Sequence, residues 1–226
     1  MVKKPLEITE QIMVLAKMFG LNATHALKFA KNLPPLQSFV PKDAQPWVRY
    51  FAVLYEGSRL ATHGHFKEDA SSAYCHAVGL VHKKISIFRP FHKVFEEDLT
   101  PKNLRMESTT VQALKKMSEK QEGDILIIAA QLGVYRHNRS HRSCITFARN
   151  EFGLGSLSVG SIILTRADRL AINVDCPGDK ASPGGGFSFS CIPNYRENHT
   201  GGIEYGISWK GDLGKNYGSA SGFLIP

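Results

Sequence analysis

Residues 123–150, GDILIIAAQLGVYRHNRSHRSCITFARN, decide how the chain is organised. They open with the apolar run 125–130, which has the length and the isoleucine content of a buried strand. The run continues into a segment in which arginine and histidine are concentrated. This stretch therefore predicts a buried strand that leads into a cationic loop.

The composition of the chain changes where this stretch begins. Sixteen of the twenty glycines lie at or after Gly123, and short apolar or alternating runs follow one another between turn residues. Strands are predicted over residues 124–135, 142–149, 156–165, 169–175, 186–192, 202–209 and 218–225. Seven short strands separated by turns indicate an antiparallel β sandwich or barrel.

The chain before Gly123 is mainly helical in pattern. Helices are predicted over residues 6–20, 23–33, 70–85 and 101–120 from the spacing of their apolar residues. Aromatic and valine-rich residues 47–60 and 85–95 indicate one or two strands, although the cations among the aromatics of 85–95 also suit stacking on single-stranded bases. The predicted fold class is α+β, with a mainly helical N-terminal region, 1–122, and a C-terminal antiparallel β domain, 123–226.

The first two predicted helices have the spacing of a helix-turn-helix. Ala16 and Gly20 are four residues apart, and Asn22 can cap the second helix. In a DNA-reading unit, the exposed face of that helix would carry Thr24, His25, Lys28 and Lys31. A structural helical hairpin with a glycine turn gives the same pattern, so both interpretations stay open.

The formal net charge of +8 favours a polyanionic partner. Residues 1–122 carry 18 Lys/Arg against 12 Asp/Glu, for +6, and residues 123–226 carry 10 against 8, for +2. The C-terminal part contains seven arginines, four of them in residues 123–150. Clustered arginines can bind phosphate through two parallel hydrogen bonds, whereas lysines give a more diffuse attraction.

The predicted contacts to nucleic acid, RNA or DNA, are the cations of the arginine-rich loop together with two lysines of the second helix. They are Arg136, His137, Arg139, His141, Arg142, Arg149, Lys28 and Lys31. His137 and His141 are also candidates for an acid and a base that cleave RNA without a metal. A phosphate-binding hairpin without catalysis needs the same residues.

Several classes of site are not indicated by the sequence. It has no nucleotide-binding glycine loop of either common pattern and no G-x-S-x-G nucleophile turn. Its four cysteines are never spaced C-x-x-C, and His63-Gly64-His65 has no evident third ligand. We therefore predict no cofactor, no metal and reduced thiols.

The N-terminus lacks the apolar core of a secretory signal, and no window has the roughly 20 apolar residues that span a bilayer. We therefore expect a cytoplasmic protein that does not enter a membrane. The expected function is non-enzymatic binding of nucleic acid. One alternative is a structural or assembly subunit of a homo-oligomer or nucleoprotein particle, and another is a metal-independent endoribonuclease that uses His137 and His141.

Overall fold

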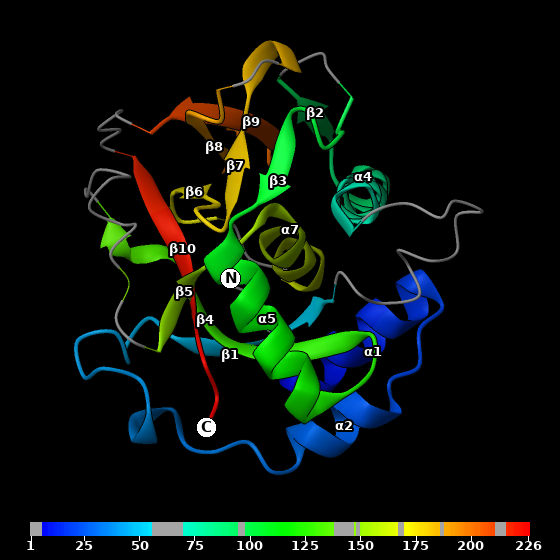
Figure 1. Cartoon of the computed structure of the whole chain (residues 1–226). Helices are drawn as coiled ribbons and strands as arrows, with labels where there is room; N and C mark the ends of the chain where they lie inside the picture. The colour runs from blue at the N-terminus through cyan, green and yellow to red at the C-terminus, as the bar shows by residue number, and fades with distance from the viewer. Residues whose placement is uncertain are drawn as a thin grey trace.

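The computed structural model describes residues 6–55, 70–94, 98–137, 147, 150–166, 170–185, 188–210 and 216–226 (Figure 1). The helices are α1 Ile8–Phe19, α2 Thr24–Ala30, η1 Leu36–Ser38, α4 Ala70–Phe88, α5 Ser108–Gln121, α7 Ser156–Thr165 and η2 Pro183–Gly185. The strands are β1 Arg49–Leu54, β2 Phe91–Lys93, β3 Leu104–Met106, β4 Ile125–His137, β5 Glu151–Gly153, β6 Asn173–Asp175, β7 Asp179–Ala181, β8 Cys191–Glu197, β9 Ile203–Trp209 and β10 Tyr217–Phe223.

The first two helices end and begin where their residues predict. Gly20 ends α1 in the left-handed conformation, with φ 67°, and its N–H donates to the carbonyl of Ala16. The side chain of Asn22 accepts a hydrogen bond of 2.8 Å from the N–H of Thr24, at the start of α2. The predicted pair of helices is therefore confirmed, although α2 has only seven residues.

The ten strands of the described residues form one mixed sheet, which confirms the α+β class. Its main path runs β1-β4-β10-β6-β8-β7-β3, while β5 pairs with β10 and β9 joins β8 to β2. Most pairs are antiparallel, but β10 is parallel to β6 and β2 is parallel to β9. Among the described strands the path ends at β1 and β3 without closing, so the predicted sandwich or barrel is not confirmed.

Residue 122 does not separate two structural units. Strands β1, β2 and β3 precede it in the chain, yet they pair with β4, β9 and β7. The main apolar core likewise combines residues from both parts, including Ile12, Val78, Leu126 and Tyr205. The change in composition at Gly123 therefore marks where most of the sheet begins, and the sheet itself extends across this point.

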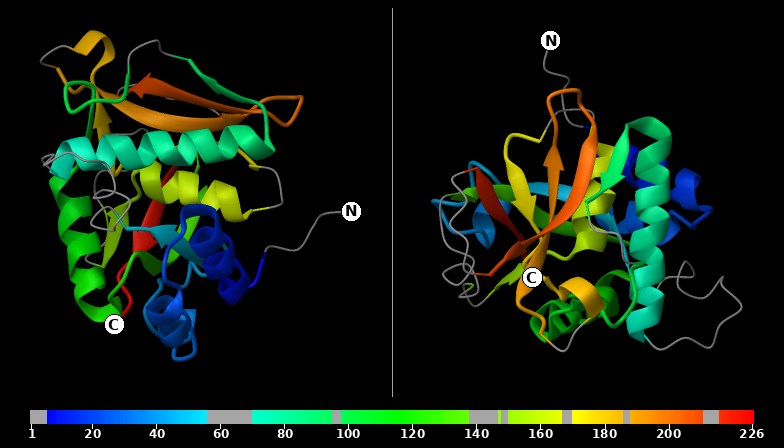
Figure 2. Two further views of the ribbon diagram at one scale, coloured as in Figure 1. Left: turned by 90° about the vertical axis from the view of Figure 1, so that its right-hand side faces the viewer. Right: turned by 90° about the horizontal axis from the view of Figure 1, so that it is seen from above.

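Residues 156–165 form helix α7, so the predicted strand there is wrong. Nine of its ten residues are buried, because α7 contacts β1 and β8 as well as α1 and α4. The left view of Figure 2 shows α4 and α7 side by side, below the orange strands β8 and β9. A helix that is buried on every side has no apolar stripe, and a short apolar run without a stripe resembles a buried strand.

Other predicted elements differ in their bounds. Helix α4 continues through residues 86–88, which leaves only β2 as strand within residues 85–95. Helix α5 begins at Ser108, because Leu104–Met106 pairs with β7 as β3. Strand β8 starts near the end of the predicted 186–192 strand and extends to Glu197, and of the predicted strand 142–149 only Phe147 is described. Within the described ranges, no helix is both long and apolar enough to cross a membrane.

Candidate nucleic-acid interface

Arg136 is buried, so it is not available as a surface ligand for phosphate. Only 5% of the residue is exposed, and its Nε donates to Oε1 of Glu151 at 2.8 Å while an NH2 group pairs with Oε2. The guanidinium also lies 5.0 Å from the centre of the Phe147 ring. The predicted phosphate contact at Arg136 is therefore corrected, because the charge of this arginine is neutralised inside the protein.

The rest of the predicted arginine-rich loop is largely outside the described residues. Arg139, His141, Arg142 and Arg149 all fall there. His137 is the last residue of β4, is half-buried, and pairs in register with Gly218 of β10. The acid and base pair of His137 and His141 therefore stays a prediction.

Lys28 and Lys31 are exposed, as the predicted interface requires, and further exposed lysines lie on a neighbouring helix. Helix α2 contacts α5, and the C-terminal half of α5 carries three further exposed lysines (Figure 1). We call the five residues of this surface the basic end: Lys28, Lys31, Lys115, Lys116 and Lys120. The lysines of α5 were not among the predicted contacts, because a lysine near a helix C-terminus is also expected from the helix dipole alone.

The described residues supply no counter-ion to the basic end. None of its five ammonium groups forms an ion pair with another described residue. The acidic residue Glu122, which directly follows α5, is paired with His25 at 3.0 Å. The sequence from residue 18 to residue 42, which contains α2, has three lysines and no acidic residue, so this end of the molecule carries excess positive charge.

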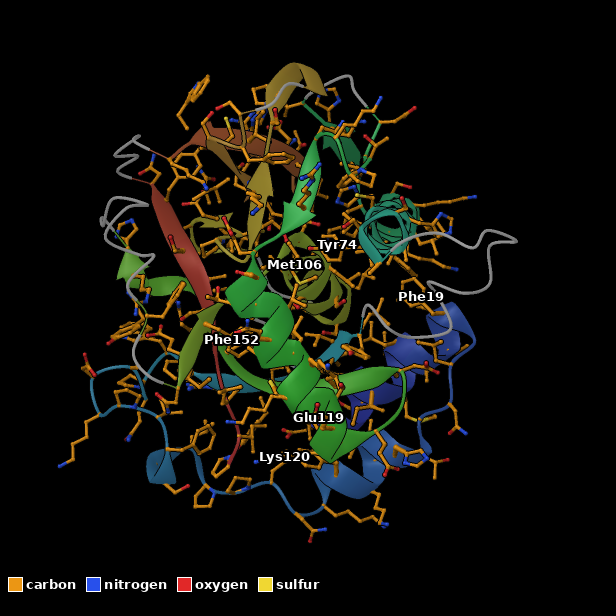
Figure 3. All side chains as sticks on the ribbon, in the orientation of Figure 1. Phe19, Tyr74, Met106, Glu119, Lys120 and Phe152 are labelled. Atoms are coloured by element: carbon orange, nitrogen blue, oxygen red, sulfur yellow. The ribbon has the colours of Figure 1, made fainter. Side chains whose placement is uncertain are left out.

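A pocket of about 440 Å³ opens at the basic end, between α5 and the last residues of the chain. We call it the tail pocket, and its lining residues are Phe39, Lys116, Met117, Lys120, Asn150, Leu224, Ile225 and Pro226. Hydrogen bonds hold its walls together: Lys120 Nζ donates to the carbonyl of Ile225 at 3.3 Å, and Asn150 Nδ2 donates to the carbonyl of Phe39 at 2.7 Å. In Figure 3, Lys120 lies at the end of α5 on the side of the C-terminus.

The geometry of α2 bears on the helix-turn-helix prediction without testing it. Two of the residues placed on the recognition face, Lys28 and Lys31, are exposed, but His25 pairs with Glu122, which follows α5. Helix α2 also contacts β4 and α5 in addition to α1. DNA reading by this helix stays a prediction, while its packing role is observed.

No pattern in the sequence indicates the buried polar network around Asp179. The Asp179 carboxylate accepts hydrogen bonds from the Tyr74 hydroxyl and, at 2.7 Å, from the N–H of Ser156 at the start of α7. The Ser156 hydroxyl lies 2.9 Å from the Tyr205 hydroxyl, and the Ser156 carbonyl accepts from Tyr195. Because α4, α7, β7, β8 and β9 each contribute to it, no local sequence pattern could reveal this network.

Burial controls the protonation of the groups in and around this network. It raises the pKa of Asp179 to about 6 and that of the neighbouring Asp175 to about 8. It lowers the pKa of His82, whose Nε2 lies 2.9 Å from the Tyr195 hydroxyl, to about 3. The network caps the start of α7 and joins it to α4 and the sheet, so we assign it a structural role.

The described cysteines agree with the predicted buried thiols. Cys75, Cys176 and Cys191 are buried, and burial raises the pKa of the Cys176 thiol, which makes it a poor nucleophile. Within the described part of the chain, no three metal-ligating side chains come together. His63 and His65 lie outside the described residues.

No relative supplies a function for these surfaces. The chain matches no protein-family model, no curated protein and no solved structure. The basic end and the tail pocket must therefore be understood from their own charges and shape.

Proposed function

We propose that this protein binds nucleic acid, RNA or DNA, through the basic end. The observation that supports this is the set of five exposed lysines on two adjoining helices, none of them paired with a described carboxylate. Phosphate groups would neutralise these charges and release condensed counterions, which favours binding in a way that depends on salt. Contacts of this kind position a nucleic acid without reading its bases.

The arginine-rich segment is adjacent in sequence to a residue of the tail pocket. Arg149 directly precedes Asn150, which lines the tail pocket. We include Arg139, His141, Arg142 and Arg149 in the proposal as further phosphate contacts, and His137 as a contact at the end of β4. Arg136 is left out because it is buried against Glu151.

The test is a titration with fluorescent oligonucleotides at several salt concentrations. Replacing Lys115, Lys116 and Lys120 by alanine should lower the salt slope for a single strand by about 1.4 to 2, since each neutralised phosphate contributes about 0.7 and two of these lysines can share one phosphate. A matched variant replaces Lys17, Lys83 and Lys102, which are equally exposed but lie outside the basic end. Equal slopes for the two triple variants would overturn the proposal.

Self-association is a second candidate function, and a specific surface favours it. Ile87 and Phe88, at the end of α4, are 64% and 63% exposed, and Phe88 lines a pocket formed with α1 and α7. Exposed large apolar side chains that cluster in this way often mark contacts between proteins. Sedimentation of the protein and of a variant with serine at both positions tests this, and a monomeric wild-type protein would contradict it.

A further inference from the structure

The tail pocket has a composition that a plain phosphate-binding surface does not need. Besides Lys116 and Lys120 it is lined by the apolar side chains of Phe39, Met117 and Leu224. A duplex presents its phosphates on the outside and would use only the two cations. An apolar wall beside two cations favours a ligand that also has a hydrophobic surface.

We infer that the tail pocket accepts one unstacked nucleotide of a single-stranded nucleic acid. This inference rests on the proposed function and narrows its substrate class. A nucleotide combines a flat, apolar base with an anionic phosphate, which matches one apolar wall and one cationic wall. Single-strand binding proteins commonly use this combination of stacking surface and positive charge.

The two cations are placed to hold a single phosphate. Lys116 and Lys120 are four residues apart on α5, so both extend from the same face of the helix. Lys120 is also tied to the carbonyl of Ile225, which keeps its ammonium group at the rim of the pocket. A phosphate bound by these lysines would share the pocket with Met117 and Phe39, which are then available to contact the base.

The size and construction of the pocket suit this ligand. Its volume of about 440 Å³ lies within the range of roughly 300–1,000 Å³ typical of small-molecule sites. Asn150 is fixed by its hydrogen bond to the Phe39 carbonyl, and its own carbonyl accepts from the N–H of Leu224 at 2.8 Å. The walls are therefore joined by three hydrogen bonds before a ligand binds, which limits the cost of ordering them.

Strandedness is the property that tests this inference. Bases in a duplex are stacked and paired, so they can enter a pocket only after they are flipped out, which costs energy. The wild-type protein should bind a short single strand more tightly than a duplex of equal length. Leu224→Trp, which fills the pocket and leaves every lysine in place, should weaken single-strand binding at least about fivefold, the lower end of a lost stacking contact, and leave duplex binding unchanged.

Two comparisons make the result decisive. Lys28→Ala removes a charge of the basic end outside the pocket and should weaken both ligands equally, while Phe39→Ala should reproduce the selective loss. Thermal unfolding of each variant shows that it is folded. Binding of both oligonucleotides with no selective effect of Leu224→Trp or Phe39→Ala would overturn the pocket assignment and leave the proposed function standing.

A second measurement separates the pocket from the wider interface. Adenosine monophosphate should shift the amide resonances of Met117 and Asn150 in an NMR titration, and these shifts should be larger than those caused by inorganic phosphate, which can occupy only the cationic wall. If adenosine monophosphate produces no shift at these residues while oligonucleotides still bind, the pocket assignment is wrong. If no oligonucleotide binds at all, the proposed function and the single-strand assignment both fail.

Discussion

The Tyr74 hydroxyl lies 2.7 and 2.8 Å from the two carboxylate oxygens of Asp179, inside the protein. Tyr74 belongs to α4 and Asp179 to β7, so this contact joins a helix to the sheet. The same carboxylate accepts from the N–H of Ser156, the first residue of α7. One buried acidic group thus holds two helices in place.

Tyr74→Phe should destabilise the protein by about 1.5–3 kcal/mol, the usual range for a hydrogen bond to a charged group. It should also raise the pKa of Asp179, because the hydrogen bond from Tyr74 lowers that pKa. Urea unfolding gives the change in stability. Tyr135→Phe is the control, since that hydroxyl bonds Asp43 in an exposed position, and an equal loss in both variants would contradict the prediction.

Stability should fall between about pH 6.5 and pH 8 because of Asp175. Burial raises its pKa to about 8, whereas in the unfolded chain it titrates near pH 4. The folded state therefore binds more protons in this range, and the free energy of unfolding decreases as the pH rises. Asp175→Asn should flatten this decrease in urea unfolding at the two pH values, while Asp43→Asn, an exposed control, should leave it unchanged.

His82 should have the opposite effect at lower pH. Its pKa is lowered to about 3, mainly by burial and to a smaller extent by repulsion from Lys93. Below about pH 6.5 the unfolded chain therefore binds a proton on His82, whereas the folded protein does not. The folded state should lose about 2 kcal/mol through His82 between about pH 7.5 and pH 5.

His82→Phe isolates this contribution. The new ring keeps the position of an imidazole whose centre lies 4.4 Å from Tyr205 and 4.8 Å from Phe91. The stability difference between wild type and variant should shrink or reverse as the pH falls, measured by urea unfolding at each pH. A constant difference across this range would show that His82 is not the group responsible.

Two glycine substitutions should change stability in opposite directions. A Cβ at Gly160 in α7 would lie 2.7 Å from Cγ1 of Val81 and 2.9 Å from the Tyr195 hydroxyl, so Gly160→Ala should cost about 1–3 kcal/mol through overpacking. Apart from the backbone of α4 itself, no described atom would lie within 4 Å of a Cβ at Gly79, and Gly79→Ala should stabilise the helix by about 0.5–1 kcal/mol. Thermal unfolding of both variants gives the sign of the change in stability. The two signs should differ if α4 and α7 are in close contact at Gly160.

Arg136→Ala should destabilise the protein by about 3–5 kcal/mol, because it leaves the Glu151 carboxylate buried without its partner. The folded variant should keep the salt slope of nucleic-acid binding, since the lost charge does not reach the surface. Chemical unfolding and the salt titration measure the two effects separately. A slope reduced by about one would show that Arg136 does contact phosphate.

Elements with a clear period were predicted well. Helix α1 has an apolar stripe through Ile12, Leu15 and Ala16, and these residues are buried. Strands β4, β9 and β10 likewise lie where runs of strand-forming residues between glycines place them. Periodicity is absent from α7, because a helix enclosed by other elements needs apolar or small residues on all sides.

The candidate site was predicted less completely. Lys28 and Lys31 are exposed as expected, but a sequence does not distinguish a surface arginine from one that is neutralised inside, as Arg136 is by Glu151. The tail pocket brings together residues 39, 116–120, 150 and 224–226. Contacts between segments so far apart depend on the strand pairing of the whole sheet, which no local pattern contains.

The position of β10 has a consequence for how the chain folds as it is synthesised. This strand lies between β4 and β6 in the sheet, although it is the last strand described in the chain. Strand β10, which pairs with β4, is therefore complete only more than eighty residues after the end of β4. At ordinary translation speeds this delay is on the order of ten seconds. During that interval the apolar edge of β4 is unpaired on that side, so a chaperone that shields exposed strands has a defined period in which to act on the nascent protein.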